Sequence, residues 1–410
     1  MPMWERVYHY GGEISNAHRR EPLRSLIRSL ITSIHIGPQV EDIPKETFKG
    51  CSNLTHVQFA NDGALKVIGD CAFRNCTALQ RVSIPPSVTE LGDEAFRGCG
   101  NLADVQFAHE GALRVVGNYA FRDCTALQRV SIPPSVTELH YGAFMGCSHL
   151  TDVQFAHGAL QVIVDYAFCG CTALQRVSIP PSVAELGRCA FYGCRNLADV
   201  QFAHGALQVV GIYAFRDCTA LQRVSIPPSV TELGSQSFMG CSNLTEAQFA
   251  REGALQVIGV DAFNGCKAMQ QVAIPSSVTQ VGKRAFRYCI KLAEVQFDEG
   301  VLEVIGDHAF EGCKAVKQVA IPPSVIMLGR CAFASCSNLA NVLLAVGLQI
   351  IENSAFSQCS SLQQVTIPTS VTELGIGAFR GCINLAEVQF NEGALGVIGE
   401  CAFEGCKALH

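Results

Sequence analysis

The sequence predicts an α/β repeat solenoid, in which short coils stack along one axis and each coil adds one strand to a parallel sheet. A Phe-x-x-Cys pattern recurs sixteen times in the 410 residues, at spacings of 23 to 25 residues, from Phe48/Cys51 to Phe403/Cys406. Apolar residues make up 49% of the chain and charged residues only 16%, which excludes a disordered protein. Repeats of about 20–29 residues with leucine-type positions are typical of solenoids, which grow in one dimension instead of dividing into globular domains.

One repeat, residues 79–96, begins with the alternation of apolar and polar residues that characterises a half-buried strand. Val82 and Ile84 are expected to point inward, and Arg81 is expected to point outward. The proline pair at 85–86 ends the strand, because proline has no N–H to donate to a neighbouring strand.

The second part of this repeat returns the chain to the core through Leu91. Gly92 follows at a position where a turn is expected to need a positive φ. A short helical or 3₁₀ turn over residues 93–97 then buries Phe96 and Cys99. No segment reaches the roughly 10–12 residues that an independent helix requires.

Two kinds of repeat alternate along the chain, one containing Ile-Pro-Pro-Ser-Val and the other Gln-Phe-Ala followed by a glycine-containing loop. Residues 123–139 reappear unchanged as residues 217–233, so the duplicated block is a pair of repeats. Counting strand starts predicts sixteen repeats. The expected domains are an N-terminal cap over residues 1–30 and a solenoid over residues 31–410, with no C-terminal cap.

The repeat L-x-x-V-x-I-P-x-S-V-x-x-[IL]-G-x-x-A-F-x-x-C resembles the BspA-like class of leucine-rich repeats, over residues 31–408. This resemblance implies a right-handed leucine-rich-repeat superhelix, with a concave parallel β-sheet and short strands, 3₁₀ or helical turns on the convex side. It also implies a binding scaffold for another protein and no conserved catalytic site. Some members of the family are adhesins, so a cell-surface adhesin or receptor-type ectodomain is the alternative, and a structural array without a specific partner is a third possibility.

Sixteen of the 21 cysteines occupy one phase of the repeat, where a free thiol behaves as a small apolar side chain in the core. We expect these thiols to be reduced, and neither a metal site nor a cofactor is predicted. No phosphate-binding loop, G-x-S-x-G or H-E-x-x-H motif is present, so no catalytic residue is assigned and the protein is expected not to be an enzyme.

The net charge of −6, with interspersed signs, gives no reason to expect nucleic-acid binding. Residues 331–351 carry no Asp, Glu, Lys or Arg, but their apolar residues are in phase with the repeat, so membrane insertion is not expected. The first ten residues contain Glu5 and Arg6 and lack the apolar stretch of a signal peptide. A cytoplasmic location is therefore expected, with the cell surface as the alternative if terminal segments are missing.

The outward strand position just before the middle core residue carries alternating charges in the first part of the chain. Because neighbouring strands lie about 4.8 Å apart, these side chains are expected to form a ladder of cross-strand ion pairs on the concave face. The residues of this predicted binding column are Arg81, Asp104, Arg129, Asp152, Arg176, Asp199, Arg223 and Glu246.

The second part of the chain departs from this pattern. Arginine disappears from the column while Glu294 remains, and the next outward column gains Leu343 between Ala320 and Thr366. An apolar side chain on a polar concave face is typical of a docking site. Glu294, Ala320, Leu343 and Thr366 are therefore added to the predicted protein-binding residues, although drift in a tolerant array would produce the same departure.

Overall fold

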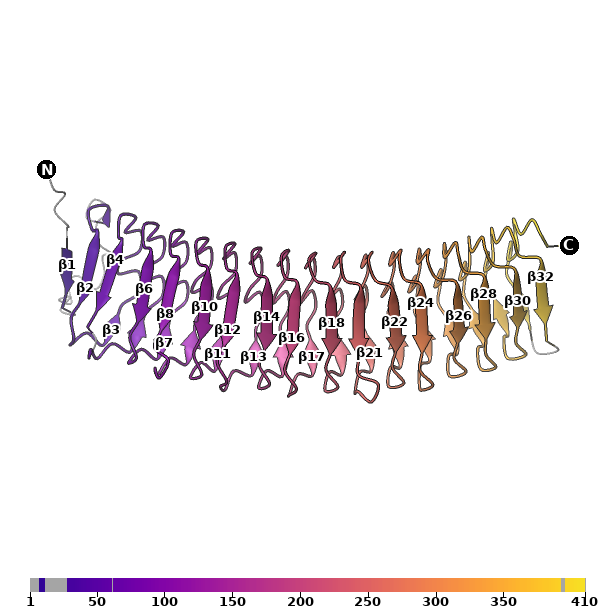
Figure 1. The fold of residues 1–410 in the computed structure, drawn as a ribbon, viewed down its shortest axis with the longest axis horizontal. Helices are drawn as coiled ribbons and strands as arrows, with labels where there is room; N and C mark the ends of the chain where they lie inside the picture. Colours follow the sequence, from indigo (N-terminus) through magenta and orange to yellow (C-terminus); the bar gives the residue numbers. More distant parts are fainter. Residues whose placement is uncertain (1–6, 12–27, 61, 392–394, 410) are drawn as a thin grey trace. The chain divides into compact units, whose positions relative to one another are not determined.

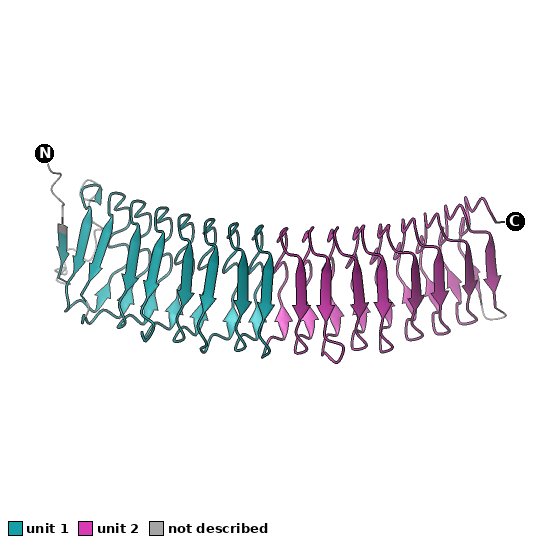
Figure 2. Ribbon diagram, viewed as in Figure 1, with its two compact units in different colours: residues 1–206 teal, residues 207–410 magenta. Residues whose placement is uncertain are grey.

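The computed structural model describes residues 7–11, 28–60, 62–391 and 395–409. The chain forms two compact units, residues 1–206 and 207–410 (Figure 2). Within each unit, successive coils contribute one four-residue strand and one two-residue strand (Figure 1). The fold is thus a parallel β-solenoid, and the sixteen predicted repeats correspond to the sixteen four-residue strands from β2 to β32. We call the surface formed by the four-residue strands the long-strand face.

The strands of unit 1 follow the repeats in order. Its four-residue strands are β1 (Val7–Tyr10), β2 (Ser33–Ile36), β4 (His56–Phe59), β6 (Arg81–Ile84), β8 (Asp104–Phe107), β10 (Arg129–Ile132), β12 (Asp152–Phe155), β14 (Arg176–Ile179) and β16 (Asp199–Phe202). Its two-residue strands are β3 (Asp42–Ile43), β5 (Val67–Ile68), β7 (Glu90–Leu91), β9 (Val115–Val116), β11 (Glu138–Leu139), β13 (Val162–Ile163) and β15 (Glu185–Leu186).

Unit 2 repeats the same arrangement. Its four-residue strands are β18 (Arg223–Ile226), β20 (Glu246–Phe249), β22 (Gln271–Ile274), β24 (Glu294–Phe297), β26 (Gln318–Ile321), β28 (Asn341–Leu344), β30 (Gln364–Ile367) and β32 (Glu387–Phe390). Its two-residue strands are β17 (Val209–Val210), β19 (Glu232–Leu233), β21 (Val257–Ile258), β23 (Gln280–Val281), β25 (Val304–Ile305), β27 (Met327–Leu328), β29 (Ile350–Ile351), β31 (Glu373–Leu374) and β33 (Val397–Ile398).

The cap predicted for residues 1–30 falls mostly outside the described residues. Of this segment the structure places β1, which pairs in parallel with β2 in the register Val7 to Ser33. Arg28 lies against the first coil, where its Nη2 approaches the Glu46 carbonyl at 3.5 Å.

The predicted core of the repeat is confirmed. Val82, Ile84, Leu91 and Phe96 are all buried, while Arg81 is exposed. The phenylalanines form a column along the stack, and neighbouring rings are nearly parallel. Within unit 1, for example, the Phe121 and Phe144 ring centroids are 5.2 Å apart with an interplanar angle of 6°.

The alternative of a helical or 3₁₀ turn before the phenylalanine is wrong for the described repeats, which contain turns and short strands there. In the second coil the N–H groups of Cys71, Phe73 and Asn75 donate to carbonyls of the next coil at 2.7 Å, and not to carbonyls one helical turn back. Cys71 and Asn75 have φ values of 53° and 60°, in the left-handed region, which a right-handed helix cannot contain. The N–H groups of Ala72 and Arg74 donate three residues back at 3.1 Å, so single turns alternate with bonds between coils and no continuous helix forms.

Gly92 is required for a reason other than the predicted one. The positive φ values of this coil occur at Glu94 and Gly98, not at Gly92. A Cβ atom on Gly92 would lie 2.6 Å from the backbone nitrogen of Asp70 and 2.7 Å from the carbonyl carbon of Gly69. The glycine therefore allows the backbones of two adjacent coils to approach closely.

The phased cysteines have a role in hydrogen bonding beyond filling space. Most of these thiols reach back to the phenylalanine carbonyl of the preceding coil, as Cys171 Sγ does to the Phe144 oxygen at 3.2 Å and Cys313 Sγ to the Phe286 oxygen at 3.1 Å. These carbonyls are buried, so the thiol satisfies an acceptor that would otherwise lack one of its partners. All 21 cysteines are free.

Burial makes these thiols unreactive. Desolvation raises the pKa of Cys289 and of Cys336 to about 12, so at about pH 8 only roughly one molecule in ten thousand carries the thiolate. We expect iodoacetamide to modify the folded protein only at the incompletely buried thiols of Cys331, Cys401 and Cys406. Intact mass should show at most three adducts in native buffer and 21 in concentrated urea. More than three adducts before unfolding would show that buried cysteines are accessible in the folded protein.

Candidate functional site

The structure brings the predicted charged column together on the long-strand face. Strand register places Arg81 opposite Asp104, Arg129 opposite Asp152 and Arg176 opposite Asp199 in unit 1. In unit 2 it places Arg223 opposite Glu246. All four arginines are exposed, whereas Asp104, Asp152 and Glu246 are half-buried and Asp199 is exposed.

The expected ladder of ion pairs is present only at its first step. Among the described residues of this column, the one ion pair within 4 Å joins Arg81 Nε to Asp104 Oδ2 at 3.2 Å. The aspartates accept a hydrogen bond from the glutamine two residues further along the same strand. Gln154 Nε2 donates to Asp152 and Gln201 Nε2 donates to Asp199, each at 2.9 Å. Gln106 Nε2 donates to Asp104 in the same way, also at 2.9 Å, so the first carboxylate of the column has both partners and the glutamine bond does not exclude the arginine.

Leu343, the apolar residue that departs from the repeat pattern in unit 2, is exposed as predicted. Leu343 has 69% of its surface exposed, the largest fraction among the large apolar side chains that are exposed. It is in register with Ala320 on the neighbouring strand β26, and Ala320 and Thr366 are also exposed. Val346, in the loop that follows β28, is 68% exposed and extends the apolar surface beyond the end of the strand.

The long-strand sheet of unit 2 is interrupted beside this patch. Strands β22 and β24 pair over four residues, and so do β26 and β28. Between β24 and β26 there is no strand pairing. Phe297, which ends β24, is half-buried, and its ring lies edge-on to the Phe310 ring of the next coil at 6.1 Å and 85°. Pairing is also missing on the other side of the patch, between β28 and β30.

A groove of about 630 Å³ lies where pairing is missing between β24 and β26. Apolar and polar groups alternate along it, so it offers both an apolar contact and hydrogen-bonding groups to a partner. Its walls are Val295, Gln296, Phe297, Asp298, Gln318, Val319, Ala320, Asn341 and Leu343. Ala320 and Leu343 of the predicted site therefore line one groove. Glu294 lies at the start of β24, in a neighbouring hollow with Ile290 and Lys291, and Thr366 lines neither the groove nor this hollow.

Sequence reasoning missed two residues of this surface. Phe297 and Val346 are not among the predicted binding residues. The replacement of the polar loop by Ala-Val-Gly at residues 345–347 could have indicated Val346.

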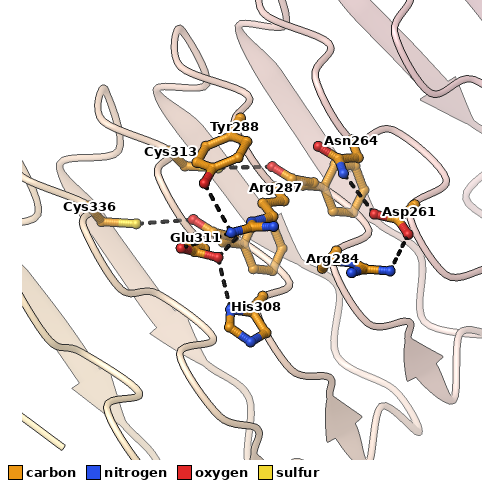
Figure 3. A network of polar contacts seen from close by, with 11 residues as sticks. Asp261, Asn264, Arg284, Arg287, Tyr288, His308, Glu311, Cys313 and Cys336 are labelled. Carbon is orange, nitrogen blue, oxygen red and sulfur yellow. Dashed lines mark hydrogen bonds and ion pairs between the residues drawn. The ribbon is translucent and has the colours of Figure 1, made fainter. Parts of the chain in front are cut away.

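A network of polar contacts in unit 2 lies elsewhere, in the turns before and after the buried phenylalanines (Figure 3). Arg287 Nε and His308 Nδ1 both reach Glu311 Oε2, at 2.6 and 2.8 Å. The Arg284 guanidinium contacts the buried Asp261 carboxylate at 2.8 Å. Each carboxylate is thus paired with a cation from a neighbouring residue or coil, so we assign this cluster to the packing of the turns.

The described residues contain no group of three or more His, Cys, Asp or Glu side chains arranged to hold a metal ion. In the same part of the chain, no helix has the length and apolar character needed to cross a membrane.

Comparison with known proteins agrees with the architecture. Overlapping matches to the model of the BspA-type leucine-rich repeat region, which comprises six copies, extend over residues 27–151, 110–211, 142–255, 251–345 and 279–410. The structure is similar to a leucine-rich repeat protein from Bacteroides ovatus, with 25% sequence identity and a TM-score of 0.64, over 83% of this chain and 80% of that chain.

A leucine-rich repeat protein from Eubacterium ventriosum matches at 20% identity and a TM-score of 0.45, over 75% of this chain and 83% of that chain. No curated protein matches the sequence. Together the matches cover residues 27–410, the part of the chain in which the coils repeat a strand, a turn and a buried Phe-x-x-Cys. The chain belongs to the BspA-type leucine-rich repeat family.

Proposed function

We propose that this protein is a non-enzymatic scaffold that binds another protein through the long-strand face of unit 2. The observation that carries the proposal is Leu343, an apolar side chain 69% exposed at the edge of a groove of about 630 Å³. A large exposed leucine costs solubility unless a partner covers it, and a groove beside it supplies the shape that a partner side chain fills. Leucine-rich repeat proteins generally act as protein-interaction scaffolds, which supports the same role.

We further propose that the protein works in a reducing compartment. The phased thiols are hydrogen-bond donors to buried carbonyls, and only the reduced, protonated thiol can donate. Oxidation of these side chains would remove the proton and add bulk in a closely packed column. A cytoplasmic location meets this requirement.

Photocrosslinking tests the location of the binding surface. We expect p-benzoylphenylalanine at Thr366, which is exposed on the long-strand face next to β28, to give one adduct of defined mass in cells that express the protein. The matched control carries the same group at Ile376, which is 55% exposed before the buried Phe379. An adduct from Thr366 that is lost in the Leu343→Asp variant supports the proposal.

Equal adducts from positions 366 and 376 would contradict the assigned face. A continuous smear of adducts that does not saturate with expression level would instead favour a structural array without a specific partner. An adduct to an extracellular matrix protein on intact cells would favour the adhesin alternative and contradict the cytoplasmic location.

A further inference from the structure

The edge of unit 2 where the long strands begin differs from the same edge of unit 1. In unit 1 the residue after the phased cysteine is often a threonine whose hydroxyl donates to a carbonyl of the preceding coil. Thr77 donates to the Ser52 carbonyl at 3.3 Å and Thr172 donates to the Ser148 carbonyl at 3.2 Å. In unit 2 the same position is occupied by Lys267, Ile290 and Lys314 in three successive coils.

The fold does not need these three side chains. The backbone N–H of Lys267 donates to Gly265 at 2.8 Å and that of Lys314 donates to Gly312 at 2.9 Å, as the N–H of Thr172 does to Gly170 in unit 1. The turn is therefore the same with threonine or with lysine. Replacing a hydroxyl that bridges two coils with a long cation gives up one hydrogen bond and adds a charge at the surface.

Lys291 and Lys317 add to the positive charge of this edge. We call Lys267, Lys291, Lys314 and Lys317 the lysine edge. All four side chains are exposed, and among the described residues none of them lies within 4 Å of a carboxylate. They occupy three successive coils, so the charges are spread over roughly 10 Å along the stack. The chain as a whole carries a net charge of −6, so this edge is a local reversal of sign.

A hollow of about 470 Å³ lies within the lysine edge. Ile290, Ala293 and Ala315 supply apolar walls, and Lys291 and Glu294 supply the charged ones. Ile290 is 40% exposed, so an apolar side chain can be placed against it. The hollow and the cations together fit a segment that carries discrete negative charges and a small apolar side chain.

We propose that the lysine edge binds an acidic, extended segment of a protein partner, with an apolar side chain of that segment seated against Ile290. This inference rests on the proposed function, because the same partner would cover the groove beside Leu343. Glu294 lies within the hollow and repels a negative charge placed beside it. A segment with spaced carboxylates can keep them away from Glu294, whereas a polyanion with a charge at every residue cannot.

Fluorescence anisotropy with synthetic peptides tests the proposal. The probe is a labelled 12-residue peptide with six Asp or Glu and two leucines, and its comparison is the same peptide with Asn and Gln in place of the acids. We expect only the acidic peptide to bind, with Kd rising at least about tenfold between about 0.05 and 0.3 M NaCl as screening increases. The double variant Lys314→Glu/Lys317→Glu should weaken binding by at least about tenfold.

The matched control is Lys66→Glu, an exposed lysine of unit 1 beside a two-residue strand, which should leave the Kd unchanged. Circular dichroism should show that all the variants fold. Equal binding of the neutral peptide, an unchanged Kd for the double variant, or no binding up to about 1 mM would each overturn the proposal. Tighter binding of a heparin fragment than of the acidic peptide would show a site for a polyanion and would also overturn it.

The two proposals can fail separately. If crosslinking from Thr366 gives a defined adduct but the acidic peptide does not bind, the scaffold function stands and the chemistry assigned to the partner is wrong. If the peptide binds and no adduct forms from Thr366, the lysine edge is a binding site and the long-strand face is not the scaffold surface.

Discussion

Replacing Phe168 with alanine is expected to lower the free energy of unfolding by about 3–5 kcal/mol, the largest loss that we expect from one substitution. Phe168 is fully buried in unit 1. Its ring stacks between Phe144 and Phe191 at centroid distances of 5.4 Å on both sides, and Phe155 meets it edge-on at 5.9 Å. The alanine variant removes all three ring contacts and leaves a cavity that the fixed spacing of the coils prevents from closing.

Urea unfolding followed by circular dichroism measures this loss, and Phe403→Ala is the matched control. Phe403 is only half-buried and, along the column of stacked rings, contacts Phe379 alone among the described residues. We expect its replacement to cost less than half as much as that of Phe168. Equal costs at the two positions would show that the column does not add stability by stacking. A cost below about 1 kcal/mol at Phe168 would show that the coils relax into the cavity.

The double substitution Leu343→Asp with Glu294→Lys is expected to abolish binding of the true partner, with Kd rising at least about 100-fold. Aspartate at position 343 places a charge against a surface that the partner covers with apolar groups, and it must be desolvated there without a counter-ion. Lysine at position 294 removes the one acidic charge in the hollow beside the groove, which by itself would favour an acidic segment there, so the expected loss of binding is assigned to the charge at position 343. Isothermal titration with the partner identified by crosslinking gives the Kd.

Stability is the control for this prediction. Leu343 and Glu294 are both exposed, so the double variant should unfold at the same urea concentration as the wild type. The variant Ile376→Asp introduces the same negative charge at another exposed apolar residue and should bind normally. An unchanged Kd for the double variant would remove the groove from consideration, and a large loss of stability would mean that lost binding reports unfolding.

Much of the fold could be predicted from the repeat itself. A position that recurs at every 23 to 25 residues has the same environment in every coil, so the alternation around Val82 and Ile84 identified the inward side chains for the whole stack. The buried column of phenylalanines and cysteines follows from the same repetition. The helical alternative failed at Cys71 and Asn75, where the left-handed backbone depends on hydrogen bonds to a coil that is more than twenty residues away in the chain.

The candidate site could be predicted only in part. Leu343 and Ala320 stand out in the sequence because they depart from the repeat, and both line the groove. The ion-pair ladder was expected from strand register alone, and the register is correct. Register sets which backbones lie opposite one another but does not decide where a long arginine side chain lies, and among the described residues Asp152 accepts from Gln154 at 2.9 Å without an arginine within 4 Å.

The sequence by itself determined the period, the inward residues, the number of coils and the family, because each of these depends on a pattern repeated many times along the chain. Only the tertiary structure decided between which long strands pairing is missing. It also decided that Gly92 is required by close backbone approach and that the phased thiols donate to buried carbonyls. These features depend on distances between adjacent coils. Such distances are fixed by how the side chains of two coils pack together, and no single repeat contains that information.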